Sequence, residues 1–169
     1  MTRRDFIVKW LVHTLALLPV WGLHMRVLSQ ARIFGASPQL LPVAAAAVGV
    51  LQGPAAGAGF GILVGVLWDA GFAHTHGLLL VLGSLIGLGA GIMAKYILRQ
   101  DLPGAFLCTA ATLAAAEAIR AVYTLMQGAG LWSVLRLALA ELVWSLVFVW
   151  PVFLLFRWVH DRTASSALF

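Results

Sequence analysis

Charged residues are scarce in this sequence: they make up 10% of its 169 residues, against about 25% in an ordinary soluble domain. Hydrophobic residues make up 62%. A soluble domain of this size has too small an interior to bury so much apolar surface. The shortage of charge therefore excludes an ordinary soluble domain and predicts a single polytopic domain within a lipid bilayer.

Cysteine is nearly absent, since Cys108 is the only one and it lies in an apolar run. A disulfide framework and a cysteine-based metal cluster are thereby excluded. The sequence also lacks the H-E-x-x-H, G-x-S-x-G and G-x-x-x-x-G-K-[ST] signatures of metalloproteases, hydrolases and phosphate-binding loops. We therefore expect no enzymatic activity, no cofactor and no metal site.

Basic residues outnumber acidic ones, eleven against six, for a formal net charge of +5. They are scattered at the ends of apolar runs and form no continuous stripe, so we expect no nucleic-acid binding. In membrane proteins, basic residues collect on the cytoplasmic side. With a cytoplasmic amino terminus, seven fall inside and two outside, which predicts that both termini are cytoplasmic; the inner set is Arg3, Arg4, Lys9, Lys95, Arg99, Arg157 and Arg162, and the outer set is Arg26 and Arg32.

Six apolar segments follow one another with short breaks at charged or Pro/Gly-rich points, and a spanning helix needs roughly 20 apolar residues. We predict an all-α bundle of six transmembrane helices over residues 6–27, 38–51, 54–70, 77–97, 103–126 and 132–158. The second and third segments are short, so tilt, local thinning of the bilayer or a broken helix is expected there.

Glycines recur every four residues in the third segment, at Gly53, Gly57, Gly61 and Gly65. This spacing places them on one inclined ridge of a helix, where a second backbone can approach closely. The fourth segment repeats the pattern with glycines 83, 87 and 91. The ridges can pack the protein's own helices; our sharper prediction is that Gly57, Gly61 and Gly65 accept a helix from a partner.

Asp69 follows this ridge near the carboxyl end of its helix, where the helix dipole disfavours a second negative charge. We predict a compensating group, either His74, His76, a loop N–H, or the start of the next helix at Gly77. Asp69 then either fixes the loop or acts as a functional carboxylate that binds a proton or ligand.

Four of the five histidines fall into two pairs of different character. His74 and His76 lie in a short external loop, and we expect them to be hydrated rather than metal-bound. His13 and His24 are eleven residues apart in the first segment, about three helical turns, so they can line one face. Each can equally well hydrogen-bond a neighbouring helix.

Three charged residues lie deep in the last two segments. Glu117 comes ten residues before Gln127 and Glu141 ten residues after Leu131, so an antiparallel hairpin puts both about 15 Å from its turn. Arg120 is three residues from Glu117 and shares its face. Because charges at mid-bilayer are costly, we predict that Glu117, Arg120 and Glu141 form an ion-pair network, with a substrate or proton path as the alternative.

Four motifs follow one another in the central third of the chain: Pro38-Gln-Leu-Leu-Pro, Gly53-Pro, the run Gly57-Ala-Gly-Phe-Gly-Ile-Leu-Val-Gly65-Val-Leu-Trp-Asp69, and Gly77-Leu. Together they resemble the MreD family of bacterial membrane proteins. Order and spacing agree with the family over about residues 38–91. Gln39 and Val66 depart from the family's usual residues.

This resemblance implies a non-enzymatic subunit of the cell-elongation complex in the bacterial inner membrane, which supports cell shape and lateral peptidoglycan synthesis. Its partners would be a single-span MreC-like protein and, more widely, MreB, RodA and a class B transpeptidase. The family's fold is similar to the substrate-binding components of vitamin transporters of the energy-coupling-factor type. Such a component is the alternative function.

Overall fold

The structure of the protein is a computed structural model that describes residues 3–28, 38–71, 77–96 and 102–165. Every element in these ranges is a helix, as the sequence predicts. In chain order they are α1 (Arg3–Leu23), a short π-helix η1 (His24–Leu28), α2 (Leu40–Gln52), α3 (Pro54–Gly71), α4 (Leu78–Tyr96), α5 (Leu102–Met126) and α6 (Leu131–Ser165). Each of the six predicted segments is thus a helix.

Three of the described helices are long and apolar enough to cross a membrane: Leu78–Tyr96, Pro103–Met126 and Leu131–Thr163. By length and composition alone, these three helices indicate a membrane protein. Two further apolar helices, Leu40–Gln52 and Pro54–Ala70, are shorter than these. At 1.5 Å per residue, the 13 residues of α2 reach about 20 Å, less than the roughly 30 Å of a bilayer core.

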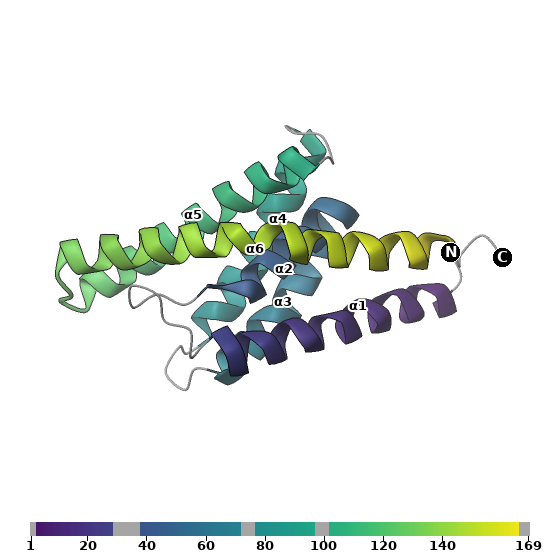
Figure 1. The fold of residues 1–169 in the computed structure, drawn as a ribbon, viewed down its shortest axis with the longest axis horizontal. Helices are drawn as coiled ribbons and strands as arrows, with labels where there is room; N and C mark the ends of the chain where they lie inside the picture. The colour runs from purple at the N-terminus through teal and green to yellow at the C-terminus, as the bar shows by residue number, and fades with distance from the viewer. Residues whose placement is uncertain (1–2, 29–37, 72–76, 97–101, 166–169) are drawn as a thin grey trace.

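The helices form two sets that cross one another. Figure 1 shows α1 and α6 running in opposite directions along the long axis, so that the start of α1 and the end of α6 lie at the same end of the molecule. Behind them lie α2, α3 and α4, which pack most extensively with one another. At the opposite end, the turn between α5 and α6 projects beyond the other helices, and we call residues 117–145 the α5–α6 arm.

The α2 helix is the centre of the fold. All its residues from Leu40 to Val50 are buried, because α2 packs against α1, α3, α4, α5 and α6. A helix that is apolar on every side is the kind that can be surrounded in this way. Gly53, at φ +91°, ends α2 and allows the chain to turn directly into α3 at Pro54.

Glycine faces join α3 to α4 with their backbones in direct contact. A Cβ atom on Gly61 would lie 2.8 Å from the Cα of Ser84, and one on Gly65 would lie 2.9 Å from the carbonyl oxygen of Leu79. A Cβ on Gly57 would overlap the carbonyl oxygen of Gly87 in the same way. Real Cβ atoms do not approach neighbours so closely, so only glycine permits this packing.

This packing corrects the prediction that Gly57, Gly61 and Gly65 accept a partner's helix. The ridge faces α4 of the same chain, and the glycines of α4 at positions 83, 87 and 91 form the other side of the contact. The alternative stated from the sequence, in which the ridges pack the protein's own helices, describes this arrangement. The spacing of the glycines indicates that a second helix approaches closely, but it does not indicate which helix this is.

Candidate functional site

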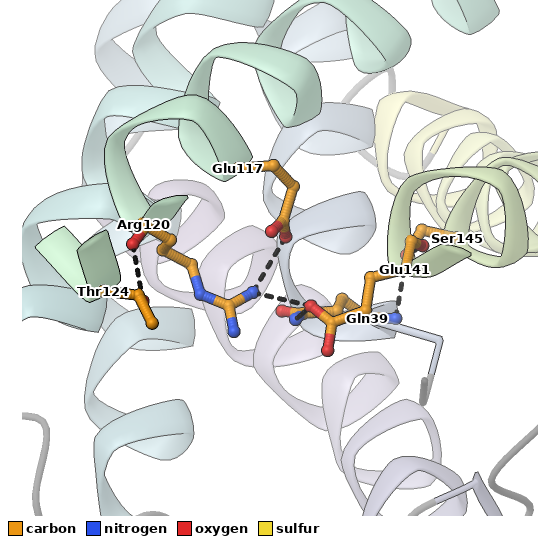
Figure 2. A network of polar contacts seen from close by, with 6 residues as sticks. All are labelled: Gln39, Glu117, Arg120, Thr124, Glu141 and Ser145. Atoms are coloured by element: carbon orange, nitrogen blue, oxygen red, sulfur yellow. Dashed lines mark hydrogen bonds and ion pairs between the residues drawn. The ribbon is translucent and has the colours of Figure 1, made fainter. Parts of the chain in front are cut away.

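Arg120 joins two carboxylates at the base of the α5–α6 arm. Its Nη1 donates to Oε1 of Glu117 at 2.8 Å and to Oε2 of Glu141 at 2.9 Å. Glu117 lies one helical turn before Arg120 on α5, whereas Glu141 reaches the same nitrogen from α6. The structure therefore brings together the three charged residues that the sequence places at one depth (Figure 2).

Gln39 extends this charged group to the start of α2. Its side-chain Nε2 donates to Oε2 of Glu141 at 2.7 Å, and its backbone N–H donates to Oγ of Ser145 at 2.9 Å. The Ser145 hydroxyl in turn donates to the backbone carbonyl of Glu141, one turn earlier on α6. Five residues, one just before α2 and the others on α5 and α6, thus form one polar network: Gln39, Glu117, Arg120, Glu141 and Ser145 (Figure 2).

The local structure explains why these side chains meet. Gln39 precedes the first residue of α2, where backbone N–H groups have no partner inside the helix. Ser145 supplies an acceptor for one of these groups, and the amide side chain is then directed at Glu141. The start of α2 is therefore fixed to the middle of α6.

The charged side chains of the network are mostly buried but keep some exposure. Glu117 and Glu141 have side chains 12% and 10% exposed, while the Arg120 side chain is 29% exposed. A cavity of about 50 Å³ lies beside them between α5 and α6, and Thr124 lines it one turn nearer the end of the arm. That volume is enough for water beside the carboxylates.

His24 contacts Pro38, the residue before Gln39. The His24 ring is buried and hydrogen-bonds the backbone of Pro38. Proline has no N–H, so the histidine must donate to the Pro38 carbonyl. Nδ1 of His24 has no hydrogen-bond partner among the described residues, which identifies Nε2 as the donor.

His13 makes a separate contact nearer the start of α1. It is buried, lies 2.6 Å from Nε2 of Gln52 at the end of α2, and stacks on Phe156 of α6 with ring centroids 6.3 Å apart. The two histidines of the first segment therefore each contact a neighbouring element, at opposite ends of α2. This matches the second of the two readings left open by the sequence.

Asp69 lies half-buried near the end of α3 and belongs to no part of the polar network. Its predicted neighbours His74 and His76 fall outside the described residues. Within the described residues no group of three or more His, Cys, Asp or Glu side chains is arranged to hold a metal ion.

Gln39 and Ser145 are the members of this region that the sequence does not single out as site residues. Gln39 carries the one available signal, because it is a polar residue between a proline and an apolar helix. Comparisons of the chain with protein-family models, with curated proteins and with solved structures find no match.

Proposed function

We propose that this chain is a non-enzymatic subunit of the bacterial inner membrane that resembles MreD and binds a single-span, MreC-like protein. In this role it belongs to the cell-elongation complex with MreB, RodA and a class B transpeptidase, and supports cell shape and lateral peptidoglycan synthesis. The proposal is supported above all by the packing of residues 38–91. These residues carry the resemblance, and those of them that the structure describes, 38–71 and 77–91, form one unit in which α2, α3 and α4 meet through glycine faces.

The six-span topology is part of this proposal. The start of α1 and the end of α6 lie at one end of the molecule (Figure 1), which is compatible with an even number of crossings. With both termini cytoplasmic, the loop 72–76 and the turn at Gly128 are external. In this topology the short α2 crosses as a core helix, since its residues from Leu40 to Val50 are buried by neighbouring helices.

The partner's helix must use a surface other than the covered glycine ridge, and we assign it to the α5–α6 arm. The arm presents large apolar side chains on its outside; Val122 is 58% exposed and Val143 is 62% exposed. Near the arm's cavity lie the small residues Ala121 and Ala138. Small side chains permit the close helix contact on which association in lipid depends.

The vitamin-transporter alternative gains no support from the cavities that described residues line. The cavity between α1 and α6 measures about 260 Å³ and is lined by apolar residues such as Pro19, Leu23 and Pro151. Sites for small molecules usually measure about 300–1,000 Å³ and contain a few convergent polar groups. Binding assays with water-soluble vitamins would still reveal such a function directly.

Copurification of the full chain with a coexpressed MreC-like protein from detergent tests the proposal. Photo-crosslinking amino acids introduced in place of Val122 and Val143 then test the arm. The same amino acid in place of Val66, which is 50% exposed on the outside of α3, is the matched control. We expect crosslinks from the arm and none from Val66. Copurification with crosslinks from Val66 alone would assign the docking surface to α3 instead of the arm. Failure of the unmodified proteins to copurify would overturn the proposed function as a subunit that binds an MreC-like protein.

A further inference from the structure

The polar network carries one more negative charge than positive charge when both carboxylates are ionised. Glu117 and Glu141 face a single cation, Arg120, whose Nη1 serves both. Arg136 lies on α6 nearer the turn and is exposed. An uncompensated charge at this depth is disfavoured, so a positive charge is expected at the network.

Other elements packed here contribute no cation to the network in the described residues. From η1, His24 contacts Pro38 through a donor nitrogen rather than a carboxylate, and Arg26 is exposed. At the start of α2, the polar group that reaches the network is the uncharged amide of Gln39.

Gln39 supplies independent evidence that a hydrogen-bond donor belongs in the network. Gln39 as a whole is only 6% exposed, and its side-chain Oε1 has no hydrogen-bond partner among the described residues. The amide cannot simply be turned over, because Nε2 donates to Glu141 and the reversed amide would set two acceptors against each other. Figure 2 shows this amide inside the network, next to Glu141.

A single proton satisfies both requirements. Each carboxylate uses one oxygen for its hydrogen bonds to described residues, Oε1 in Glu117 and Oε2 in Glu141, which leaves its other oxygen for a proton. A protonated carboxyl group is neutral and gains an O–H donor. The network then has one carboxylate for one guanidinium, and the O–H is a donor of the kind that Oε1 of Gln39 lacks.

We propose that the network is a proton-binding site in which Glu117 and Glu141 share one proton and Gln39 accepts the resulting O–H hydrogen bond. The proton adds to a carboxylate oxygen without any other bond being made or broken. It exchanges with water through the cavity that Thr124 lines toward the end of the arm. Because Gln39 precedes α2, the proton links α2 to α5 and α6. This site is independent of the proposed partner.

Infrared spectra of the full-length protein in lipid nanodiscs test this proposal. We expect a carbonyl stretch of one protonated carboxyl group at neutral pH, which shifts in D2O and disappears at alkaline pH. Glu117→Gln and Glu141→Gln should each abolish it, because either change leaves one carboxylate for Arg120. Gln39→Leu should retain the band but shift its frequency, since the carboxyl group loses its amide partner.

Three results would overturn the proposal. If the neutral-pH spectrum is unchanged in both glutamine variants, both carboxylates are ionised and the network holds water alone. If only one variant abolishes the band, the proton belongs to that residue and is not shared. If the band appears only after Arg32→Gln, a cation from residues 29–37 balances the charge instead. Circular dichroism and size-exclusion profiles verify that each variant is folded. Glu117→Gln and Glu141→Gln are measured separately, so each reports on its own carboxyl group.

Discussion

Gly61 of α3 and Gly83 of α4 lie backbone to backbone: a Cβ atom on Gly83 would be 2.5 Å from the carbonyl oxygen of Gly61. Neither position can accept a side chain unless the helices separate. In lipid, where apolar surface gains little by leaving its surroundings, such close contact is a main source of helix association. At this point the α3–α4 interface therefore requires that both residues lack a methyl group.

Gly61→Ala should destabilise the folded protein, because its methyl group meets backbone atoms of α4 that cannot rotate away. Overpacking of this kind costs about 1–3 kcal/mol. Gly59→Ala is the matched control on the same helix, since its Cβ would meet only the Trp10 ring at an ordinary 3.4 Å. Thermal unfolding in detergent measures both variants. Equal midpoints for the two would show that the α3–α4 contact is looser than described.

Arg120→Leu should destabilise the protein more than replacement of Glu117, Arg120 and Glu141 together by apolar residues. The single change leaves two carboxylates facing each other, whereas the triple change removes every member of the charged group. Removing one partner of a buried ion pair costs about 3–5 kcal/mol, and the partial exposure of Arg120 places it at or below the lower end. Folded yield and unfolding midpoint are the measurements. A triple variant that folds well but fails in cells would assign the charges a role beyond stability.

His13 and Gln52 should show coupled energetics across the contact between α1 and α2. His13→Leu leaves the Gln52 amide without its ring partner in a half-buried position, at a cost of about 1–3 kcal/mol. The double change to His13→Leu and Gln52→Leu should then cost less than the sum of the single changes. A double-mutant cycle of unfolding free energies gives the coupling. Strict additivity would contradict the contact.

Topology can be tested with single cysteines at exposed, described positions. Gln127→Cys lies at the turn after α5 and Asp161→Cys near the end of α6, while the native Cys108 is fully buried and provides an unreactive background. For cytoplasmic termini, we expect an impermeant thiol reagent to label Gln127→Cys in intact cells and Asp161→Cys only after permeabilisation. The reversed pattern would invert the orientation.

Local sequence patterns were sufficient to locate the helices and the charged triad. Each apolar run is bounded by charges, proline or glycine, so helix limits follow from the chain itself. Glu117 and Glu141 could be matched because both are counted from one short turn, which fixes the register of an antiparallel pair. Even so, α6 continues to Ser165, beyond the predicted end at residue 158. The prediction followed the apolar run, whereas the helix continues through the polar residues after Trp158.

Contacts between segments far apart in the chain could not be derived in this way. Gln39 meets Glu141 and Ser145 across more than a hundred residues, and no local pattern specifies where α2 sits against α6. The glycine ridges show the same limit, since a ridge on α3 fits any helix with a small-residue face. Pairing Gly61 with Gly83 requires the spatial arrangement of both helices.

The burial of α2 has a consequence for how the protein is assembled during synthesis. In the proposed six-span topology, α2 enters the membrane before α6 is synthesised, so its start lacks the Ser145 and Glu141 groups that later hold Gln39. Being only 13 residues long, α2 is poorly suited to remain across the bilayer alone. Together with α3, to which Gly53 joins it directly, it forms a helical hairpin that the insertion machinery can admit as one unit. Nascent chains that end before residue 131 should therefore keep α2 open to attack by membrane proteases, and completion of α6 should close that period of vulnerability.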